Sequence, residues 1–261
     1  MNVIVCIKQV PEIEQVRVDE ASGKVVHPPG AEMVNPFDMY AIEEGLRLKE
    51  KSGGKVTAIS VGPKENETSL REALSLGVDE AILLNDQSFL TEDPIATARV
   101  LAAGIKKLGE FDLILCGKQA VDDDSAQVAP ALAEFLLLPQ VLFVRKIREL
   151  KEGSLTVERT TEEGYDVVES TLPAVLSVVK EINEPRLPSL KRKMRARKAP
   201  ITEWSQAELS EFIAKLPGGE PNLKSLKVSP PPPRPKGEIL TGTPEEVSEK
   251  LVEKLKGLQV I

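Results

Sequence analysis

The sequence predicts an α/β protein built on a doubly wound, mostly parallel β-sheet. Through the first 140 residues, short apolar runs alternate with segments whose apolar residues recur at helical spacing. This alternation is typical of parallel strands joined by helical crossovers, with helices on both faces of the sheet. From Val141 onward the strand-like runs are separated by turns at Glu152-Gly153 and Glu163-Gly164. Such spacing indicates an antiparallel extension of the same sheet.

The elements of the first half follow in regular order. Strands are expected at residues 2–7, 55–61 and 80–84, with a further strand beginning at Phe111. Helices are expected to begin at Asn35, near Glu65, at Asp93-Pro94 and after Ser125. In the first of these, Asn35 can cap the helix, Pro36 suits the first helical position and Asp38 suits the first turn. Apolar residues predicted to face the core are Met39, Ile42, Leu46 and Leu48, and later Ile95, Ala98, Leu101, Ala102 and Ile105.

The second half predicts a sheet extension followed by a C-terminal arm. Strands are expected at residues 143–150, 154–160, 166–171 and 173–179, and a basic run follows at residues 191–198. The Pro-rich segment 217–242 should be extended, and Thr243-Pro244-Glu245-Glu246 resembles a capping box that opens a last helix. We therefore divide the chain into an α/β domain, residues 1–216, and an arm, residues 217–261. The stripe Val247, Leu251, Leu255 and Leu258 is expected to pack on a partner subunit.

Residues 8–34 form a long irregular connection, with a ribbon expected at residues 17–26 that turns at Ser22-Gly23. Loops of this length inside a domain are uncommon and are usually functional.

The strongest candidate for a ligand site is the polar loop between the Phe111 strand and the following helix. Its acidic turn, Asp122-Asp123-Asp124, follows Cys116-Gly117, and helical spacing begins after Ser125. In an open α/β sheet such a loop lies at the carboxyl end of a strand, where ligands bind. Unpaired N–H groups at the helix start can hold a phosphate, while the aspartates cap the helix or reach ribose and adenine. The alternative is a solvated helix cap without a ligand. The sequence contains neither G-x-G-x-x-G nor G-x-x-x-x-G-K-[ST].

Composition excludes several other classes of function. A net charge of −7 and 3% aromatic residues argue against nucleic-acid binding. The sequence has no apolar run of about 18 residues and no signal-peptide pattern, so a cytoplasmic protein is expected. Its two cysteines, Cys6 and Cys116, are expected to be buried thiols. The single histidine, His27, lies in a Pro-rich loop, which leaves little basis for a metal site or a catalytic triad.

Four blocks of sequence, in order along the chain, resemble the β subunit of electron transfer flavoproteins. The most specific is VERTTEEGYDVVESTLPAVLSVVKEINEPRLPSLKRKM, residues 157–194, and the others are VIVCIKQVP, NPFDMYAIEE and GKQAVDDDSAQ. The resemblance implies a heterodimer with an α subunit, which chiefly holds a redox-active FAD. It also implies that the pair carries electrons from flavoprotein dehydrogenases, or a related donor, to a quinone-linked or other acceptor. Flavin-based electron bifurcation is one mode of such transfer in this family. A subunit of this kind is an electron carrier, and no catalytic residue is assigned.

The resemblance further implies a nucleotide within the β subunit, which is AMP in one type and a second FAD in another. Carried over by position, the cofactor-binding residues are Cys6, Asn35, Pro36, Phe37, Asp38, Val61, Gly117, Lys118, Gln119, Ala120, Val121, Asp122, Asp123, Asp124, Ser125, Ala126, Gln127 and Val128. The acidic triplet resembles the AMP type, whereas Ser125-Ala126-Gln127-Val128 resembles the FAD type. A second FAD is favoured slightly, with AMP as the alternative.

By the same resemblance, Leu190 is expected to anchor in a partner dehydrogenase, while the basic run beside it attracts acidic partners. Two rival functions from other classes remain. One is an adenine-nucleotide-binding regulatory domain of the stress-protein type, and the other is an adenylyl-transfer enzyme. The latter is disfavoured because no Gly-rich phosphate loop follows the first strand.

Overall fold

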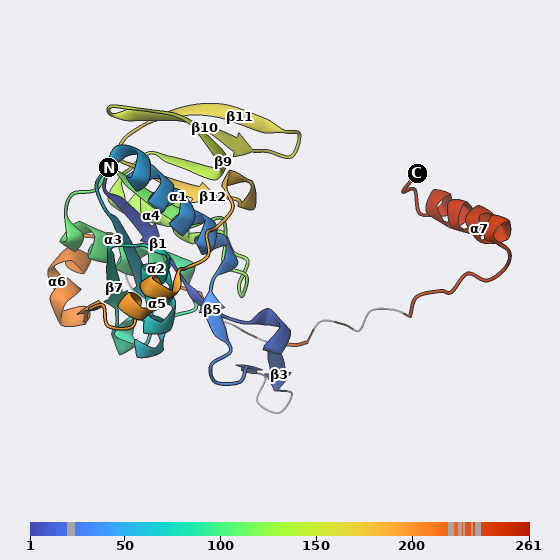
Figure 1. Ribbon diagram of the computed structural model, residues 1–261. Helices are drawn as coiled ribbons and strands as arrows, with labels where there is room; N and C mark the ends of the chain where they lie inside the picture. The colour runs from blue at the N-terminus through green and yellow to red at the C-terminus, as the bar shows by residue number, and fades with distance from the viewer. Residues whose placement is uncertain (20–23, 219–221, 224–225, 227, 231, 233–235) are drawn as a thin grey trace. The chain divides into compact units, whose positions relative to one another are not determined.

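A nine-stranded sheet forms the centre of the described structure (Figure 1). In the computed structural model, structure is described for residues 1–19, 24–218, 222–223, 226, 228–230, 232 and 236–261. The chain divides into two units, Met1–Val228 and Ser229–Ile261. Across the sheet of the first unit the strand order is β11 (Tyr165–Thr171), β10 (Ser154–Thr160), β9 (Gln140–Lys151), β12 (Ala174–Val178), β8 (Leu113–Gly117), β1 (Val3–Cys6), β6 (Val56–Val61), β7 (Glu80–Leu84) and β13 (Thr202–Trp204).

The sheet is mostly parallel, as predicted. Neighbouring strands from β9 through to β13 pair in parallel. Only β10 runs antiparallel, pairing with β9 on one side and β11 on the other, so the antiparallel extension is also confirmed. Alternate residues of the central strands face opposite sides. Val3 and Val5 belong to one apolar cluster, while Ile4 and Cys6 belong to the other.

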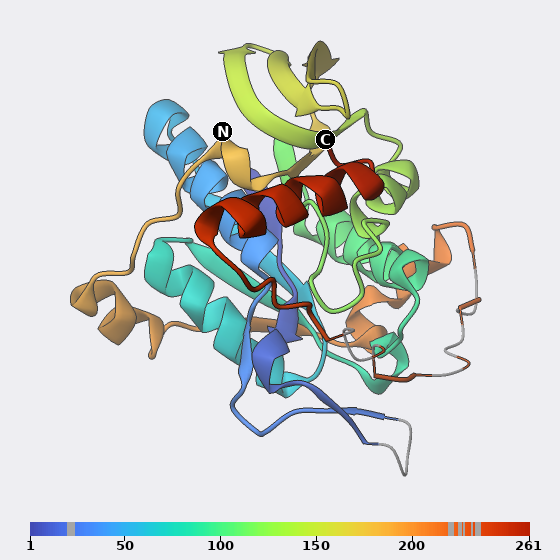
Figure 2. The ribbon, with the colours of Figure 1, turned by 90° about the vertical axis from the view of Figure 1, so that its right-hand side faces the viewer.

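Helices cover both faces of the sheet, which confirms the doubly wound prediction. Helices α1 (Pro36–Ser52) and α2 (Glu67–Leu76) contribute their apolar residues to the first cluster. Helices α3 (Pro94–Leu108), α4 (Val128–Leu136) and α6 (Gln206–Ala214) contribute to the second. The short helix α5 (Leu190–Ala196) lies beside α2 in Figures 1 and 2.

The arrangement of β1 and β8 positions the site. These two strands are hydrogen-bonded neighbours in the sheet. The chain leaves β1 for α1 on one face and leaves β8 for α4 on the other. A crevice therefore opens between the carboxyl ends of the two strands, at a topological switch point, where α/β proteins bind their ligands.

The long connection after β1 contains two small antiparallel ribbons. Strand β2 (Gln9–Pro11) pairs with β5 (Glu32–Val34), and β3 (Arg17–Asp19) pairs with β4 (Lys24–Val26). The second of these is the ribbon predicted for residues 17–26, and its predicted turn at Ser22-Gly23 lies outside the described residues. The β3–β4 ribbon projects away from the central sheet of the first unit (Figures 1 and 2), whereas Val34 of β5 belongs to the apolar cluster on one face of that sheet.

Three local predictions were wrong. Asn35 occupies the N-cap position of α1, but its side chain bonds to the 119–121 loop and accepts no capping N–H of the helix. Ile95 is 44% exposed because it lies on the outer side of the first turn of α3. Helix α4 begins at Val128, with Gln127 at its N-cap position, so the acidic triplet does not cap it. The local sequence pattern did not show which side of the helix faces the core, where the helix begins, or which distant residue a side chain contacts.

Asp93 performs two structural tasks at the start of α3. One carboxylate oxygen caps the helix by accepting the N–H groups of Ile95 and Ala96, at 2.8 and 3.3 Å. The other accepts the N–H groups of Asn222 and Leu223, at 2.8 and 3.2 Å. Burial tends to raise the pKa of Asp93, but these four hydrogen bonds outweigh it and lower the pKa.

The second unit contains the predicted last helix, α7 (Pro244–Gly257). Its capping box is formed by Thr243 and Glu246, each accepting the other's backbone N–H. Within this unit, Leu251 and Leu258 of the predicted apolar stripe are 48% and 72% exposed. Val247 and Leu255 are half-buried, so the stripe is only partly covered in the unit as described. Among the described residues, every helix is too short or too polar to cross a membrane.

Candidate functional site

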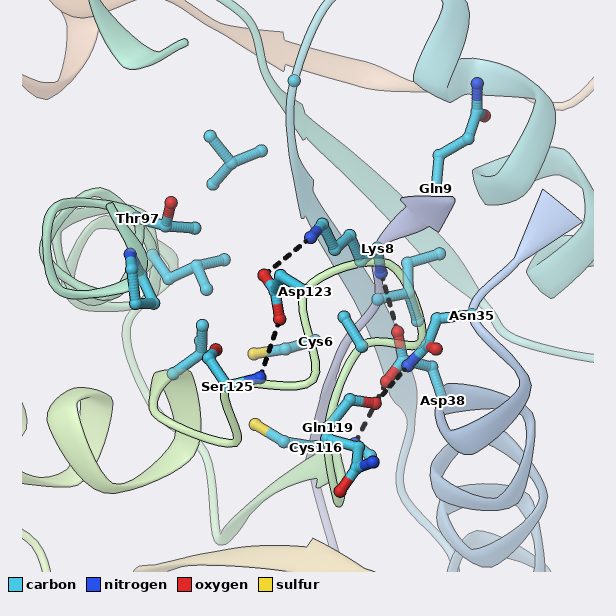
Figure 3. A pocket seen from close by; sticks show the side chains of 18 of the residues that line it. Cys6, Lys8, Gln9, Asn35, Asp38, Thr97, Cys116, Gln119, Asp123 and Ser125 are labelled. Carbon is cyan, nitrogen blue, oxygen red and sulfur yellow. Dashed lines mark hydrogen bonds and ion pairs between the residues drawn. The ribbon is translucent and has the colours of Figure 1, made fainter. Parts of the chain in front are cut away.

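A cavity of about 600 Å³ lies at the carboxyl ends of β1, β6 and β8 (Figure 3). Its walls come from the residues that follow these strands, from the first turn of α1, and from the segment between Phe89 and Leu101. The volume falls within the range of sites for small ligands and cofactors. The cavity therefore lies where the topology of the sheet places a ligand.

Asp38 ties three chain segments together at the base of this cavity. Its carboxylate accepts the N–H of Lys8, at 2.8 Å, and the N–H of Gly117, at 3.1 Å. The residue itself lies in the first turn of α1 and is 5% exposed. Burial raises the pKa of Asp38 to about 7, although the hydrogen bonds from Lys8, Asn35 and Gly117 work in the opposite direction. Asp38 thus fixes the ends of β1 and β8 against α1.

Gly117 is required where the β8 backbone approaches α1. A Cβ atom at this position would lie 2.7 Å from the carbonyl carbon of Phe37 and 2.8 Å from the nitrogen of Asp38. Both of these are backbone atoms, which cannot move aside as the end of a flexible side chain does. Only glycine allows the two segments to lie this close.

Asn35 holds the loop after β8 in place. Its side-chain amide donates to the carbonyl of Gln119 at 2.8 Å, and its side-chain oxygen accepts the N–H of Val121 at 3.2 Å. Asn35 is 1% exposed, so both bonds are protected from water. The first turn of α1 therefore positions the acidic loop through two residues, Asn35 and Asp38.

The acidic loop is bound to the end of β1 by a lysine. The ammonium group of Lys8 lies 2.8 Å from Asp122 and 3.0 Å from Asp123. Asp123 also accepts the N–H of Ser125 at 3.0 Å (Figure 3). Partial burial tends to raise the pKa of Asp123, but the hydrogen bonds from Ser125 and Lys8 outweigh it and lower the pKa.

The backbone between the acidic loop and α4 has an unusual conformation. Asp124 and Ala126 have φ angles of 55° and 54°, in the left-handed region that few residues other than glycine and asparagine adopt. For an alanine this costs on the order of 1–2 kcal/mol. The conformation brings the chain to the start of α4, where the first N–H groups of the helix have no acceptor within the helix. Strain of this kind is found most often at binding sites.

The two cysteines lie at the base of the cavity as free, buried thiols. A hydrogen bond with Cys6, together with burial, raises the pKa of the Cys116 thiol well above its usual value. A thiol in this state is neutral and a poor nucleophile or metal ligand. Among the described residues, no cluster of three or more histidine, cysteine or acidic side chains has the arrangement of a metal site.

Comparisons with known proteins identify the family of the chain. The sequence profile of the electron transfer flavoprotein domain matches residues 25–209. The chain is 41% identical to the electron transfer flavoprotein subunit beta of Thermoanaerobacterium thermosaccharolyticum over the full length of both proteins. The chain belongs to the electron transfer flavoprotein β-subunit family. It is also 38% identical to the Bacillus subtilis subunit beta, over 98% of each chain, and to the caffeyl-CoA reductase-Etf complex subunit CarD of Acetobacterium woodii, over the full length of both.

Most of the cofactor-binding residues predicted from the family resemblance line the cavity. They are Cys6, Asn35, Asp38, Val61, Gly117, Lys118, Gln119, Ala120, Asp123, Ser125, Ala126, Gln127 and Val128. Others in the same segments are not among the described lining residues, namely Pro36, Phe37, Val121, Asp122 and Asp124.

The sequence analysis did not predict two parts of the cavity wall. The first follows the strands directly and consists of Ile7, Lys8, Gln9, Gly62, Pro63 and Asn66. The second comes from the start of α3 and the chain before it, and includes Phe89, Leu90, Thr91, Glu92, Pro94, Thr97 and Leu101, with Ala129 of α4 beside it. The residues of the first group directly follow predicted strands, and this signal in the sequence would have identified them. The second depends on how α3 packs on the sheet.

Leu190, predicted to bind a partner, is the first residue of α5 and is 78% exposed. Leu187 and Met194 are also exposed, and the basic residues of the 191–198 run surround them. Arg186 attaches this segment to α1, because its guanidinium lies 2.7 Å from the buried carboxylate of Glu43. Exposed apolar side chains on a segment held in this way are suited to binding another protein.

Proposed function

We propose that this chain is the β subunit of a heterodimeric electron carrier, which accepts electrons from flavoprotein dehydrogenases or a related donor and passes them to a quinone-linked or other acceptor. Membership of the electron transfer flavoprotein β-subunit family over its full length is the observation that carries this proposal. The redox chemistry belongs to bound FAD, held chiefly by an α subunit, and this chain is an electron carrier without catalytic side chains of its own.

The role proposed for the cavity is to hold the adenosine-phosphate part of a nucleotide. Three features of the cavity fit such a group. Gly117 brings the β8 backbone close to α1, the start of α4 presents N–H groups suited to a phosphate, and Lys8 supplies a positive charge. The assigned residues that line the cavity would hold this ligand directly. The other assigned residues would position the loop between Gly117 and Val128, which holds it.

A second FAD remains slightly favoured over AMP as the nucleotide of this subunit. The cavity of about 600 Å³ extends beyond the acidic loop to the segment between Phe89 and Leu101, which favours a ligand larger than AMP. Repulsion between the Asp123 carboxylate and a second phosphate is an objection to FAD. The ion pair between Asp123 and Lys8 weakens that objection. A second flavin would suit an electron-bifurcating complex.

Denaturing the purified complex and identifying the released nucleotides by mass tests this choice. Two FAD per heterodimer would support a second flavin, whereas one FAD with one AMP would overturn it. The visible spectrum tests the carrier itself, because oxidised FAD absorbs near ~380 and ~450 nm. A complex without these bands would favour the rival function, a regulatory domain that binds an adenine nucleotide.

Leu190→Ala is expected to weaken binding of the donor dehydrogenase by about 1–4 kcal/mol, since an exposed anchor of this kind carries much of an interface energy. Electron delivery, followed across dehydrogenase concentrations, should slow while the flavin spectrum stays unchanged. Leu137→Ala is the matched control, because Leu137 is 84% exposed and lies at the end of α4. Unaltered kinetics in the Leu190→Ala complex would contradict the assignment.

Deleting residues 243–261 is expected to weaken association with the α subunit. The deletion removes α7, whose apolar stripe is only partly covered in its own unit. Sedimentation of the co-expressed subunits measures the effect. Leu251→Glu on the stripe should reproduce it, whereas Glu253→Gln, which changes the polar side, should not. A truncated chain that still sedimented as a full-strength heterodimer would refute the idea.

A further inference from the structure

The cavity proposed to hold a nucleotide phosphate is lined by more acidic than basic groups. Its described wall contains three carboxylates, Asp38, Glu92 and Asp123, and two ammonium groups, Lys8 and Lys118. The ammonium of Lys118 lies over the ring of Phe143, 5.8 Å from its centroid. Lys8 is therefore the cation that faces the acidic loop, and a phosphate in this cavity depends on it for charge balance.

Lys8 is unusually well placed for this purpose. Its backbone N–H is held by Asp38, which fixes the position of the residue at the end of β1. Its ammonium reaches Asp122 and Asp123 simultaneously, at 2.8 and 3.0 Å. The side chain is 42% exposed, and ion pairs this exposed contribute little to stability. The ion pairs of Lys8 therefore contribute little to the free energy of unfolding. Their main effect is to reduce the negative electrostatic potential at the acidic loop.

We propose that Lys8 is a positioning and specificity residue of the nucleotide site, which neutralises Asp123 so that the acidic loop accepts a second ligand phosphate. This inference rests on the proposed function, and it deepens it by assigning the discrimination between mono- and diphosphate ligands to one side chain. A first phosphate at the start of α4 is held mainly by backbone N–H groups. A second phosphate has no helix start of its own, so the charge of Asp123 matters more to it.

The size of the effect follows from the charges. A carboxylate and a phosphate about 5 Å apart repel by an amount equivalent to roughly a 15- to 300-fold change in affinity at an effective dielectric of about 20–40. Replacing Lys8 by methionine restores that repulsion. We expect Lys8→Met to weaken ADP binding by roughly 30-fold and AMP binding by only about 3-fold. ADP serves as the probe because it carries two phosphates without a flavin.

The experiment titrates AMP and ADP by calorimetry into the full-length chain, co-purified with an electron transfer flavoprotein α subunit and freed of β-subunit nucleotide. Lys8→Arg should retain wild-type affinity, since it keeps the charge. The double variant Lys8→Met/Asp123→Asn should recover ADP affinity to within about 3-fold of wild type, because it removes the Asp123 charge together with Lys8, and Asp122 is not among the described lining residues. Lys64→Met is the matched control: Lys64 also bridges two carboxylates, Glu67 and Glu203, but lies outside the cavity wall.

The outcomes separate this inference from the proposed function. Wild-type protein that bound neither AMP nor ADP would refute the nucleotide site itself. If the wild-type protein bound ADP and Lys8→Met bound it with the same affinity, only the role of Lys8 would be refuted. Failure of the double variant to recover ADP affinity would also refute it, because neutralisation of Asp123 would then not be the cause. Thermal unfolding of each variant checks that the fold is intact.

Discussion

Gly117→Ala is expected to abolish nucleotide binding and to lower the free energy of unfolding by about 2–3 kcal/mol. The added methyl group would meet the backbone of Phe37 and Asp38 at less than 3 Å. To make room, β8 must move away from α1, which also breaks the hydrogen bond from the Gly117 N–H to Asp38. The loop that begins at this point carries most of the predicted cofactor-binding residues, so a small shift displaces the whole site.

Urea unfolding and the nucleotide content of the purified protein measure the two effects of this substitution. Gly257→Ala is the matched control, since a Cβ atom there meets nothing within 4 Å. The control should retain its nucleotide and wild-type stability to within ~0.5 kcal/mol. A Gly117→Ala protein that kept both would show that the close approach of β8 to α1 is not needed.

Arg186→Met is expected to lower the free energy of unfolding by about 2 kcal/mol, because it leaves the buried carboxylate of Glu43 with one cationic partner in place of two. The side chain of Glu43 is 5% exposed and accepts hydrogen bonds from Arg186 and Arg47, both at 2.7 Å. A fully unpaired buried charge would cost more, but Arg47 remains in the variant. We also expect the segment carrying Leu190 to become mobile, as seen by faster hydrogen exchange.

The pH dependence of stability provides a second measurement of the same pair. Burial tends to raise the pKa of Glu43, but the hydrogen bonds from Arg186 and Arg47 outweigh it and lower the pKa. A lowered pKa contributes stability that is present above the ordinary glutamate pKa, about 4.3, and is lost as the pH falls toward the folded value. The wild type should therefore lose more stability than Arg186→Met on acidification.

Glu50→Gln serves as the control for the arginine substitution. Arg186 also pairs with Glu50, but that carboxylate is 55% exposed, so its loss should change stability by less than ~0.5 kcal/mol. Equal effects of the two substitutions would mean that burial of Glu43 does not determine the strength of the attachment.

The sheet and its helices were predictable because their signals are local. The apolar runs of β1, β6 and β7 and the Pro residues that open α1, α3 and α7 are visible without any knowledge of tertiary contacts. The same local reasoning failed at Asn35. An asparagine before a helix is a good cap, yet here its side chain is used 84 residues away, at Gln119. Sequence rules describe neighbours along the chain and cannot anticipate such a partner.

The cavity was predictable in part for a similar reason. The loop after β8 is marked by its acidic triplet, and its position at a strand end was predictable, whereas the pairing of β8 with β1 is a feature of the folded sheet. The opposite wall, near Phe89 and Thr97, has no sequence signal for a ligand, because its place depends on the packing of α3. The ion pairs between Lys8 and the loop join residues more than 110 positions apart, and they too appear only in the folded chain.

Asp93 gives two segments of the first unit a single point of attachment. Its carboxylate holds both the first turn of α3 and the backbone at residues 222–223. Pro94, the next residue, is part of the cavity wall. Protonation of Asp93 would weaken all four hydrogen bonds together. Release of residues 222–223 and loosening of this part of the wall are therefore thermodynamically linked, and each alters the free energy of the other by the same amount.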